Sequence, residues 1–162
     1  MKVNKLLVPL AFSMLFGSGI ATAADFNKGW AAWLSGDFKT ALAEWTPLAE
    51  QGDAAAQIEL GLMYENGQGV LENDKTAVKW YTKAAEQGYF SAQGALGLMY
   101  EYGDGVLTDN RRAYMWYNLA SYNGSKVGGK SKNELAEKMT PADISKAQDM
   151  SSLCLESNYT DC

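Results

Sequence analysis

The sequence repeats itself with a period of 36 residues. When residues 54–88 are aligned with residues 90–124, 17 of the 35 positions are identical, and they are spread over the whole length of the copy. Repeats of this period are typical of solenoids, in which each unit is too small to bury its own apolar face and stacks on its neighbours instead. The repeat therefore predicts a row of similar units.

The first half of each copy predicts an α-helix. Ala56, Leu60, Met63 and Tyr64 follow the spacing i, i+4, i+7, i+8 that places apolar side chains on one helix face. Asp53 is a residue type that caps helix N-termini, and it stands just before this pattern. The same pattern recurs 36 residues later.

The second half of each copy predicts another helix, separated from the first by a flexible turn. Gly67 and Gly69 provide that turn, because glycine adopts backbone conformations that end helices. The helix that follows starts near Asp74 and ends near Gly88, with Trp80 on its buried face. No segment alternates with period two, so we expect essentially no strand.

Glycine inside the first helix of each copy indicates close packing. Gly61 and Gly97 occupy the same repeat position, although glycine in a helix costs ~1 kcal/mol relative to alanine. We expect the missing side chain to let the neighbouring helix approach. The large side chains of Trp80 and Trp116 are then expected to fill the remaining space.

The first copy has the pattern AQxxLGxMYxxGxGV followed by AxxWYxxAAxxG, and the second copy repeats it with Ser121 in place of the second alanine of the AA pair. This pattern resembles the Sel1-like repeat, a relative of the tetratricopeptide repeat. The resemblance implies an all-α fold, a right-handed α/α superhelix (solenoid) of helix pairs. It also implies structural roles for the framework residues that recur in both copies, namely Gly61, Tyr64, Gly67, Trp80, Gly97, Tyr100, Gly103 and Trp116.

The repeats divide the chain into five segments. We expect a signal peptide in residues 1–23, a variant N-terminal helix pair in 24–52, Sel1-like repeats in 53–88 and 89–124, and capping helices in 125–162. In the last segment Thr140 and Pro141 predict a helix start. The stretch 122–132 contains Gly124, Gly128 and Gly129 and is expected to be a loose connection.

The N-terminus has the three parts of a secretory signal peptide. Lys2 and Lys5 make a basic start, residues 6–16 form an apolar run, and Ala21-Thr22-Ala23 matches a cleavage site. A membrane anchor is the alternative, but the run is too short to cross a bilayer core of ~30 Å. We therefore expect a periplasmic or secreted protein without membrane insertion after cleavage at Ala24.

The net charge of the chain narrows the classes of partner that it can bind. Cleavage removes two lysines and no acid, so the net charge falls from −5 to −7, which disfavours nucleic acid as a partner.

Cys154 and Cys162 form an even pair in an exported chain and predict a disulfide that holds the C-terminal tail.

The sequence contains few residues that carry out catalysis. It has no histidine, which excludes histidine-dependent triads and the usual zinc sites, and we expect no metal and no cofactor. Glu65 and Glu101 are repeat-equivalent carboxylates, and paired carboxylates perform acid–base catalysis in glycosidases. We interpret both as solvated residues at helix ends, and we do not expect an enzyme.

Candidate binding residues lie on the first helices of the repeats, which face the concave side in related repeats. Leu62 and Leu98 are on the same stripe as Ile58, and Phe90 and Tyr102 are aromatic where the other copy is not. A core position and a groove position are both compatible with this pattern. If these residues line a groove, it suits an extended peptide or an amphipathic helix.

The preferred function is an exported scaffold, monomeric by preference, that binds a protein or peptide partner. One alternative is an enzyme directed at peptidoglycan or β-lactams, because some Sel1-like proteins are linked to β-lactam binding. Those proteins carry a cysteine pair in every repeat, whereas this chain has none inside its repeats. The other alternative is a carbohydrate-binding module that uses exposed tryptophans.

Overall fold

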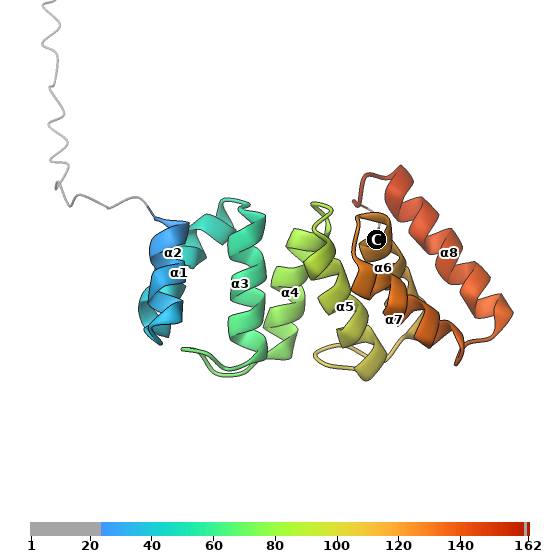
Figure 1. The fold of residues 1–162 in the computed structure, drawn as a ribbon, viewed down its shortest axis with the longest axis horizontal. Helices are drawn as coiled ribbons and strands as arrows, with labels where there is room; N and C mark the ends of the chain where they lie inside the picture. The colour runs from blue at the N-terminus through green and yellow to red at the C-terminus, as the bar shows by residue number, and fades with distance from the viewer. Residues whose placement is uncertain (1–23, 161) are drawn as a thin grey trace, which may run out of the picture.

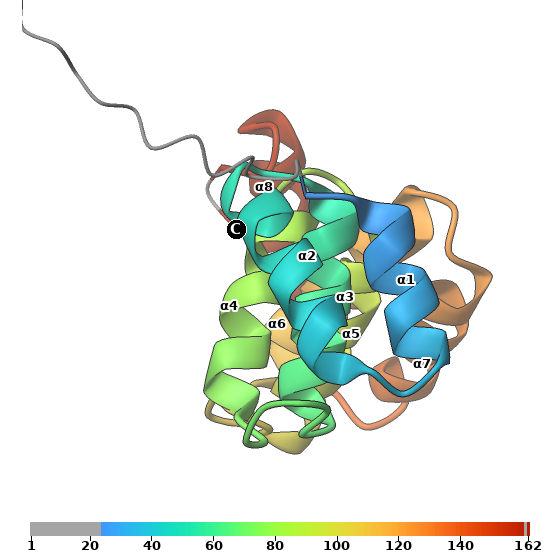
Figure 2. The same ribbon diagram turned by 90° about the vertical axis from the view of Figure 1, so that its left-hand side faces the viewer.

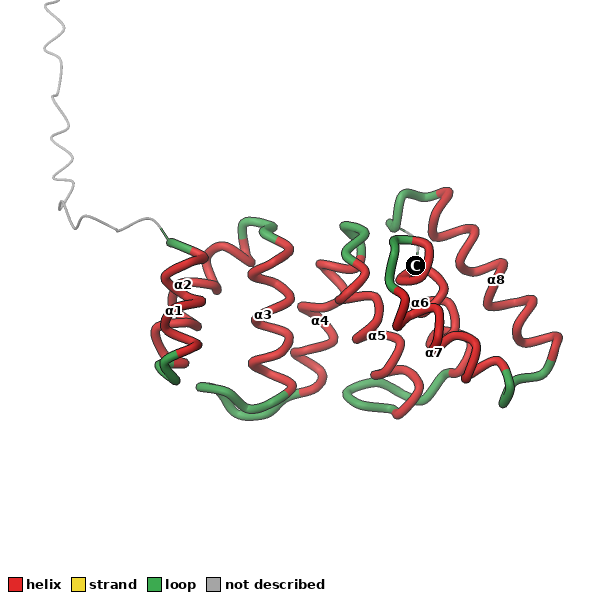
Figure 3. The backbone as a smooth tube through the Cα atoms, viewed as in Figure 1, coloured by secondary structure: helices red, strands yellow, loops and turns green. Residues whose placement is uncertain are grey.

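The computed structural model describes residues 24–160 and residue 162. The predicted signal peptide, residues 1–23, lies outside the described residues. Within them the chain forms eight α-helices joined by turns and loops, with no strand (Figure 3). The prediction of an all-α fold is confirmed for this part of the chain.

The helices follow one another in chain order along the long axis of the molecule (Figure 1). Helices α1 to α7 each pack mainly against their neighbours in sequence, which is the arrangement of a solenoid. Their bounds are Phe26–Leu34 (α1), Phe38–Glu50 (α2), Ala54–Glu65 (α3), Asp74–Ala85 (α4), Phe90–Tyr102 (α5), Asn110–Tyr122 (α6), Lys126–Ala136 (α7) and Pro141–Glu156 (α8).

The helix starts follow from capping residues. The side chain of Asp53 accepts a hydrogen bond from the backbone N–H of Ala56, which satisfies a donor that the first turn leaves unpaired. Thr140 caps α8 in the same way, and Pro141 occupies the first turn. Both predicted helix starts are confirmed.

A glycine and an aromatic ring form the contact between the two helices of each repeat. A Cβ atom added at Gly61 would lie 2.5 Å from a ring carbon of Tyr81, and one added at Gly97 would overlap the ring of Tyr117. Both tyrosines are almost fully buried. The prediction of close packing at the two glycines is therefore correct.

The prediction that Trp80 and Trp116 fill the space at the glycines was wrong. The side chains that lie there are Tyr81 and Tyr117. Tyr81 and Tyr117 each follow the predicted tryptophan by one residue, which rotates the side chain by about 100° around the helix. Trp116 is buried in the core on another side of α6, and Trp80 is only partly buried, beneath Lys83.

The first helix pair uses the same contact with a larger ring. Gly29 of α1 is buried against the indole of Trp45, and the indole N–H donates a hydrogen bond to the carbonyl of Phe26 at 3.1 Å. Residues 24–52 therefore contain a helix pair with the same glycine–aromatic contact, joined by a turn at Gly36 in place of the longer loop.

The loops between α3 and α4 and between α5 and α6 are packed rather than flexible. Gly69 has a positive φ of 73°, and a Cβ atom there would lie 2.7 Å from the Cβ of Phe38 in the preceding helix pair. Gly105 lies in the same way against the backbone of Asp74. Each loop thus contacts the start of the preceding second helix, which corrects the expectation of a flexible turn.

The expected loose connection in residues 122–132 is largely helical. Ser125 caps α7, and Gly128 is buried inside it, with a hypothetical Cβ 2.8 Å from the Cβ of Ala120. Clustered glycines usually indicate a loop, but Gly128 permits close helix contact as Gly61 does. The stretch therefore adds a helix to the solenoid.

At the C-terminal end the helices pack differently from those of the repeats. Helices α7 and α8 both pack on α6 rather than on each other. Helix α8 therefore covers a part of α6 that α5 and α7 do not cover. A disulfide joins Cys154 to Cys162 as predicted, and the hydroxyl of Tyr159 donates to Asn123 at 3.0 Å. The tail is therefore attached both to α8 and to the end of α6.

The first and second helices of the pairs lie on different sides of the molecule. Viewed from the N-terminal end, α1, α3, α5 and α7 are on one side and α2, α4 and α6 on the other (Figure 2). Helices α1 and α7 extend beyond α3 and α5 in this view, so the side formed by the first helices is concave.

No helix in the described part of the chain is long and apolar enough to span a membrane.

Candidate binding groove

A largely apolar groove of about 450 Å³ lies between three of the first helices. We call it the α3–α5–α7 groove. Its walls are apolar and small side chains of these helices, and its base is formed by two tyrosine rings. The lining residues are Leu62, Glu65, Tyr81, Phe90, Ser91, Gly94, Ala95, Leu98, Tyr117, Ser125, Val127, Gly128 and Ser131.

The centre of the groove is open because α5 carries a glycine there. A Cβ atom added at Gly94 would meet no other atom within 4 Å, in contrast to Gly97 one turn later. The equivalent residue in the other repeat is Ile58, whose side chain packs partly against the core. Gly94 therefore has no packing reason to be glycine, and its effect is to leave the middle of the helix face empty.

Two equivalent hydrogen bonds orient the tyrosines beneath the groove. The hydroxyl of Tyr81 donates to Glu65 Oε2 at 2.5 Å, and the hydroxyl of Tyr117 donates to Glu101 Oε2 at 2.9 Å. Burial raises the pKa of both tyrosines far above the ordinary value, and the neighbouring carboxylate raises each further. Both tyrosines are therefore neutral donors at any physiological pH.

The two carboxylates differ in what else they bind. Lys138, from the connection between α7 and α8, donates to Glu101 Oε1 at 3.2 Å. Glu65 lines the groove, and no cation of the described residues forms an ion pair with it. The interpretation of both as solvated residues at helix ends is thus incomplete, because each carboxylate also accepts from a buried tyrosine.

The groove contains three of the five residues proposed from the sequence. Leu62, Phe90 and Leu98 line it and are exposed. Ile58 packs partly against the core, and Tyr102 is exposed on the same helix as Phe90 but does not line the groove.

The sequence did not predict that α7 contributes to the lining of the groove. Val127 is 74% exposed and Gly128 lies beside it in the lining. The glycines in this stretch instead predict a loose connection. The signal that was available is Ser125, a capping residue just ahead of them.

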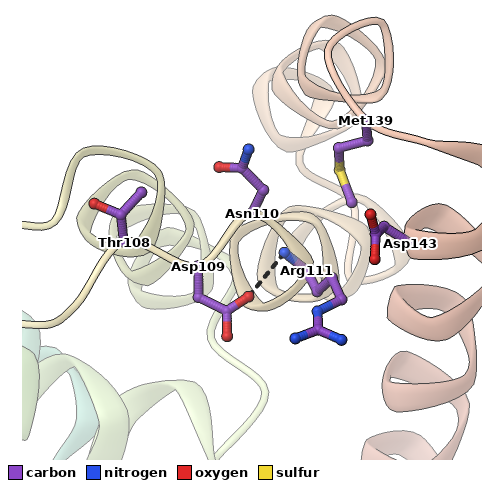
Figure 4. Close-up of a pocket in the computed structure, with 6 residues that line it drawn as sticks. All are labelled: Thr108, Asp109, Asn110, Arg111, Met139 and Asp143. Atoms are coloured by element: carbon purple, nitrogen blue, oxygen red, sulfur yellow. Dashed lines mark hydrogen bonds between the residues drawn. The ribbon is translucent and has the colours of Figure 1, made fainter.

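A second pocket lies at the start of α6 and is polar (Figure 4). Its carboxylates are already engaged at helix starts, since Asp109 accepts from the backbone N–H of Arg111 at 3.0 Å and Asp143 accepts from the side-chain hydroxyl of Thr140, the cap of α8, at 2.8 Å. Nowhere in residues 24–160 do three acidic or cysteine side chains converge as metal ligands would. This pocket is accounted for by helix capping.

Comparison with known proteins agrees with the repeat pattern. The sequence profile of the Sel1 repeat matches residues 54–89 and 91–125. No curated protein sequence matches the chain.

The solved structures with a similar fold include two of known source. One is a protective antigen present in uropathogenic Escherichia coli strains that displays an SLR fold, with a TM-score of 0.77 and 31% identity over 82% of this chain and 30% of the antigen. The other is a Sel1 repeat protein from Oxalobacter formigenes, with a TM-score of 0.66 and 32% identity over 68% of this chain and 46% of that one. The chain therefore spans less than half the length of either neighbour.

Proposed function

The chain is a Sel1 repeat protein, and from this premise we propose that it is an exported scaffold that binds a protein or peptide partner in the α3–α5–α7 groove. Gly94 is the observation that carries the proposal. A glycine in mid-helix costs ~1 kcal/mol, and here no neighbouring atom requires it. The cost is explained if the space above Gly94 is kept for an apolar side chain of a partner.

The apolar residues around Gly94 support this assignment. Leu98 and Phe90 are each about half exposed, and Leu62 faces them across the groove from α3. Clusters of exposed apolar side chains in a concave surface are typical of protein-binding sites. The covering of these side chains by a partner removes their apolar area from water, which is the main driving force for association.

Export is proposed from two independent features. Residues 1–23 have the basic, apolar and small-residue parts of a signal peptide. The disulfide between Cys154 and Cys162 fits an oxidising compartment such as the periplasm or the exterior of the cell. An intact mass that begins at Ala24 in the protein recovered from outside the cytoplasm is expected, and a mass that includes Met1 would contradict export.

The tryptophans do not favour carbohydrate binding. All five lie in the described residues, and Trp30 alone is more than about a third exposed, stacked on Trp33. Glycan-binding platforms need a flat exposed ring, so this surface offers at most one. A scaffold without catalytic activity agrees better with the groove, whose one ionisable side chain at the rim is Glu65.

Affinity capture with matched surface variants tests the proposal. The double variant Phe90→Ser, Leu98→Ser removes apolar side chains from the groove. The control, Leu71→Ser, Leu107→Ser, removes two large apolar side chains that are 91% and 90% exposed on the loops. A lysate of the producing cells should yield a protein captured by wild type and control but not by the groove variant. Equal capture of every protein by all three would contradict the proposal.

A further inference from the structure

The two repeats place the same carboxylate beside the same tyrosine, but only one carboxylate is paired with a cation. Glu101 uses Oε2 to accept from Tyr117 and Oε1 to accept from Lys138. Glu65 uses Oε2 to accept from Tyr81. In the described part of the chain its Oε1 accepts no hydrogen bond and its carboxylate has no ion pair.

The pair of Glu101 and Lys138 shows how this repeat position binds a cation. The tyrosine hydroxyl fixes one carboxylate oxygen from below, and the lysine arrives from the element that follows, at 3.2 Å from the other oxygen. Residue 36 positions before Lys138 is Tyr102, which carries no charge, so the next element cannot supply a cation to Glu65. The cation that the chain provides at one repeat is missing at the other.

Glu65 differs from Glu101 also in its surroundings, since it lines the α3–α5–α7 groove. A partner that fills the groove covers the apolar side chains of Leu62 and Leu98 and approaches the free oxygen of Glu65. A cation on that partner forms a charge-assisted hydrogen bond there, whereas an acidic side chain is repelled. The net charge of −5, or −7 without residues 1–23, attracts a basic segment from a distance as well.

We propose that the occupant of the groove is a peptide segment of a protein partner in which a lysine or arginine stands beside apolar residues, with the cation paired to Glu65. This proposal rests on the function proposed above and specifies its ligand. The apolar residues lie over Gly94 between Leu98 and Val127, and the basic residue reaches the α3 side of the groove.

Selection from a library of short random peptides displayed on phage tests both the proposed function of the groove and the pairing of a cation with Glu65. The baits are wild type, Glu65→Gln, the matched control Glu101→Gln, and the double variant Phe90→Ser, Leu98→Ser. Glutamine keeps an oxygen that accepts from the tyrosine hydroxyl, so the fold is expected to persist, and circular dichroism melts verify it.

Wild type should enrich peptides in which lysine or arginine recurs at one fixed distance from apolar residues. Glu65→Gln should enrich the apolar residues without the basic one, and Glu101→Gln should select the wild-type pattern. A selected peptide, resynthesised, should bind Glu65→Gln about fivefold more weakly than wild type, as for the loss of one exposed ion pair. Added salt should weaken its binding to wild type more than to Glu65→Gln.

The contrary results are distinct. Apolar peptides without a basic preference, or a basic preference that survives in Glu65→Gln, would overturn the assignment of Glu65 and leave the groove as a peptide site. The same peptides enriched by wild type and by the Phe90→Ser, Leu98→Ser variant, or none enriched by wild type, would contradict the proposed function itself.

Discussion

Three glycines within helices show that one residue type serves two purposes in this fold. Gly61 and Gly97 leave room for tyrosine rings of the neighbouring helix, and Gly94 faces open space. The sequence predicted the first role because both glycines recur at the same repeat position. It could not identify the ring, because Trp80 and Tyr81 are adjacent and both are large enough to fill the gap.

The glycines of α5 provide a matched test of packing. Gly97→Ala should destabilise the protein by ~1–3 kcal/mol, because the added methyl group overlaps the ring of Tyr117 in a closely packed core. Gly94→Ala should stabilise it by ~0.5–1 kcal/mol, because alanine favours the helix and meets no neighbour. Chemical denaturation of both variants measures the difference, and equal effects would refute the packing role of Gly97.

The buried tyrosines make stability depend on pH in the alkaline range. The pKa values of Tyr81 and Tyr117 are raised in the folded protein, while an unfolded tyrosine has a pKa of about 10. Their contribution is fully present below about pH 10. Above it the unfolded chain releases protons that the folded protein retains, so stability falls as pH rises.

A variant without the two tyrosine hydroxyls separates the ionisation of Tyr81 and Tyr117 from the ionisation of other groups. The double variant Tyr81→Phe, Tyr117→Phe keeps the rings in the spaces over the glycines but has no phenol to ionise. Between about pH 8 and about pH 11 the wild type should lose more stability in urea than the variant does. An identical loss in both proteins would show that the two tyrosines do not ionise on unfolding.

At the scale of elements, buried glutamines join successive helix pairs. Gln93 at the start of α5 donates to the carbonyl of Ala85 at the end of α4 at 3.1 Å, and it accepts from the amide of Asn123 at 2.9 Å. Gln57 donates to Ala49 in the same way at the previous junction. The bonds to Ala85 and Ala49 connect the end of one pair to the start of the next and so help to fix the stacking, while the bond from Asn123 joins the start of α5 to the end of α6 within one pair.

Loss of this junction should destabilise the whole stack. Gln93→Leu removes both bonds in a fully buried position and should cost about 1–3 kcal/mol. The control Gln51→Leu changes an exposed residue and should stay within ~0.5 kcal/mol of wild type. Denaturation midpoints compare them, and an equally small effect of both changes would show that the buried amide is not needed.

Element prediction from the sequence succeeded where local signals agreed. Capping residues, apolar spacing and the 36-residue period all indicated the same helices in residues 53–124. It failed at α7, where Gly128 resembles a loop residue until Ala120 is found against it. That contact joins segments of different helices, so no local pattern reveals it.

At the scale of the whole molecule, the groove results from stacking and not from any single repeat. Its lining comes from α3, α5 and α7, with tyrosines of α4 and α6 at the base. The sequence indicated Leu62, Phe90 and Leu98 because they lie on one helix stripe or differ between the copies. Val127 and the unpaired oxygen of Glu65 could be found only once the helices were placed beside one another.

The central claim is that Gly94 keeps this groove open for a partner, and the variant Gly94→Ile tests it most directly. The substitution gives α5 the residue that α3 has at the equivalent position, Ile58, and it meets no neighbour at its Cβ. Stability and binding of the captured partner or of a selected peptide are measured on the same preparation. We predict unchanged or slightly raised stability together with loss of binding, and a stable Gly94→Ile protein that binds as wild type does would contradict the account.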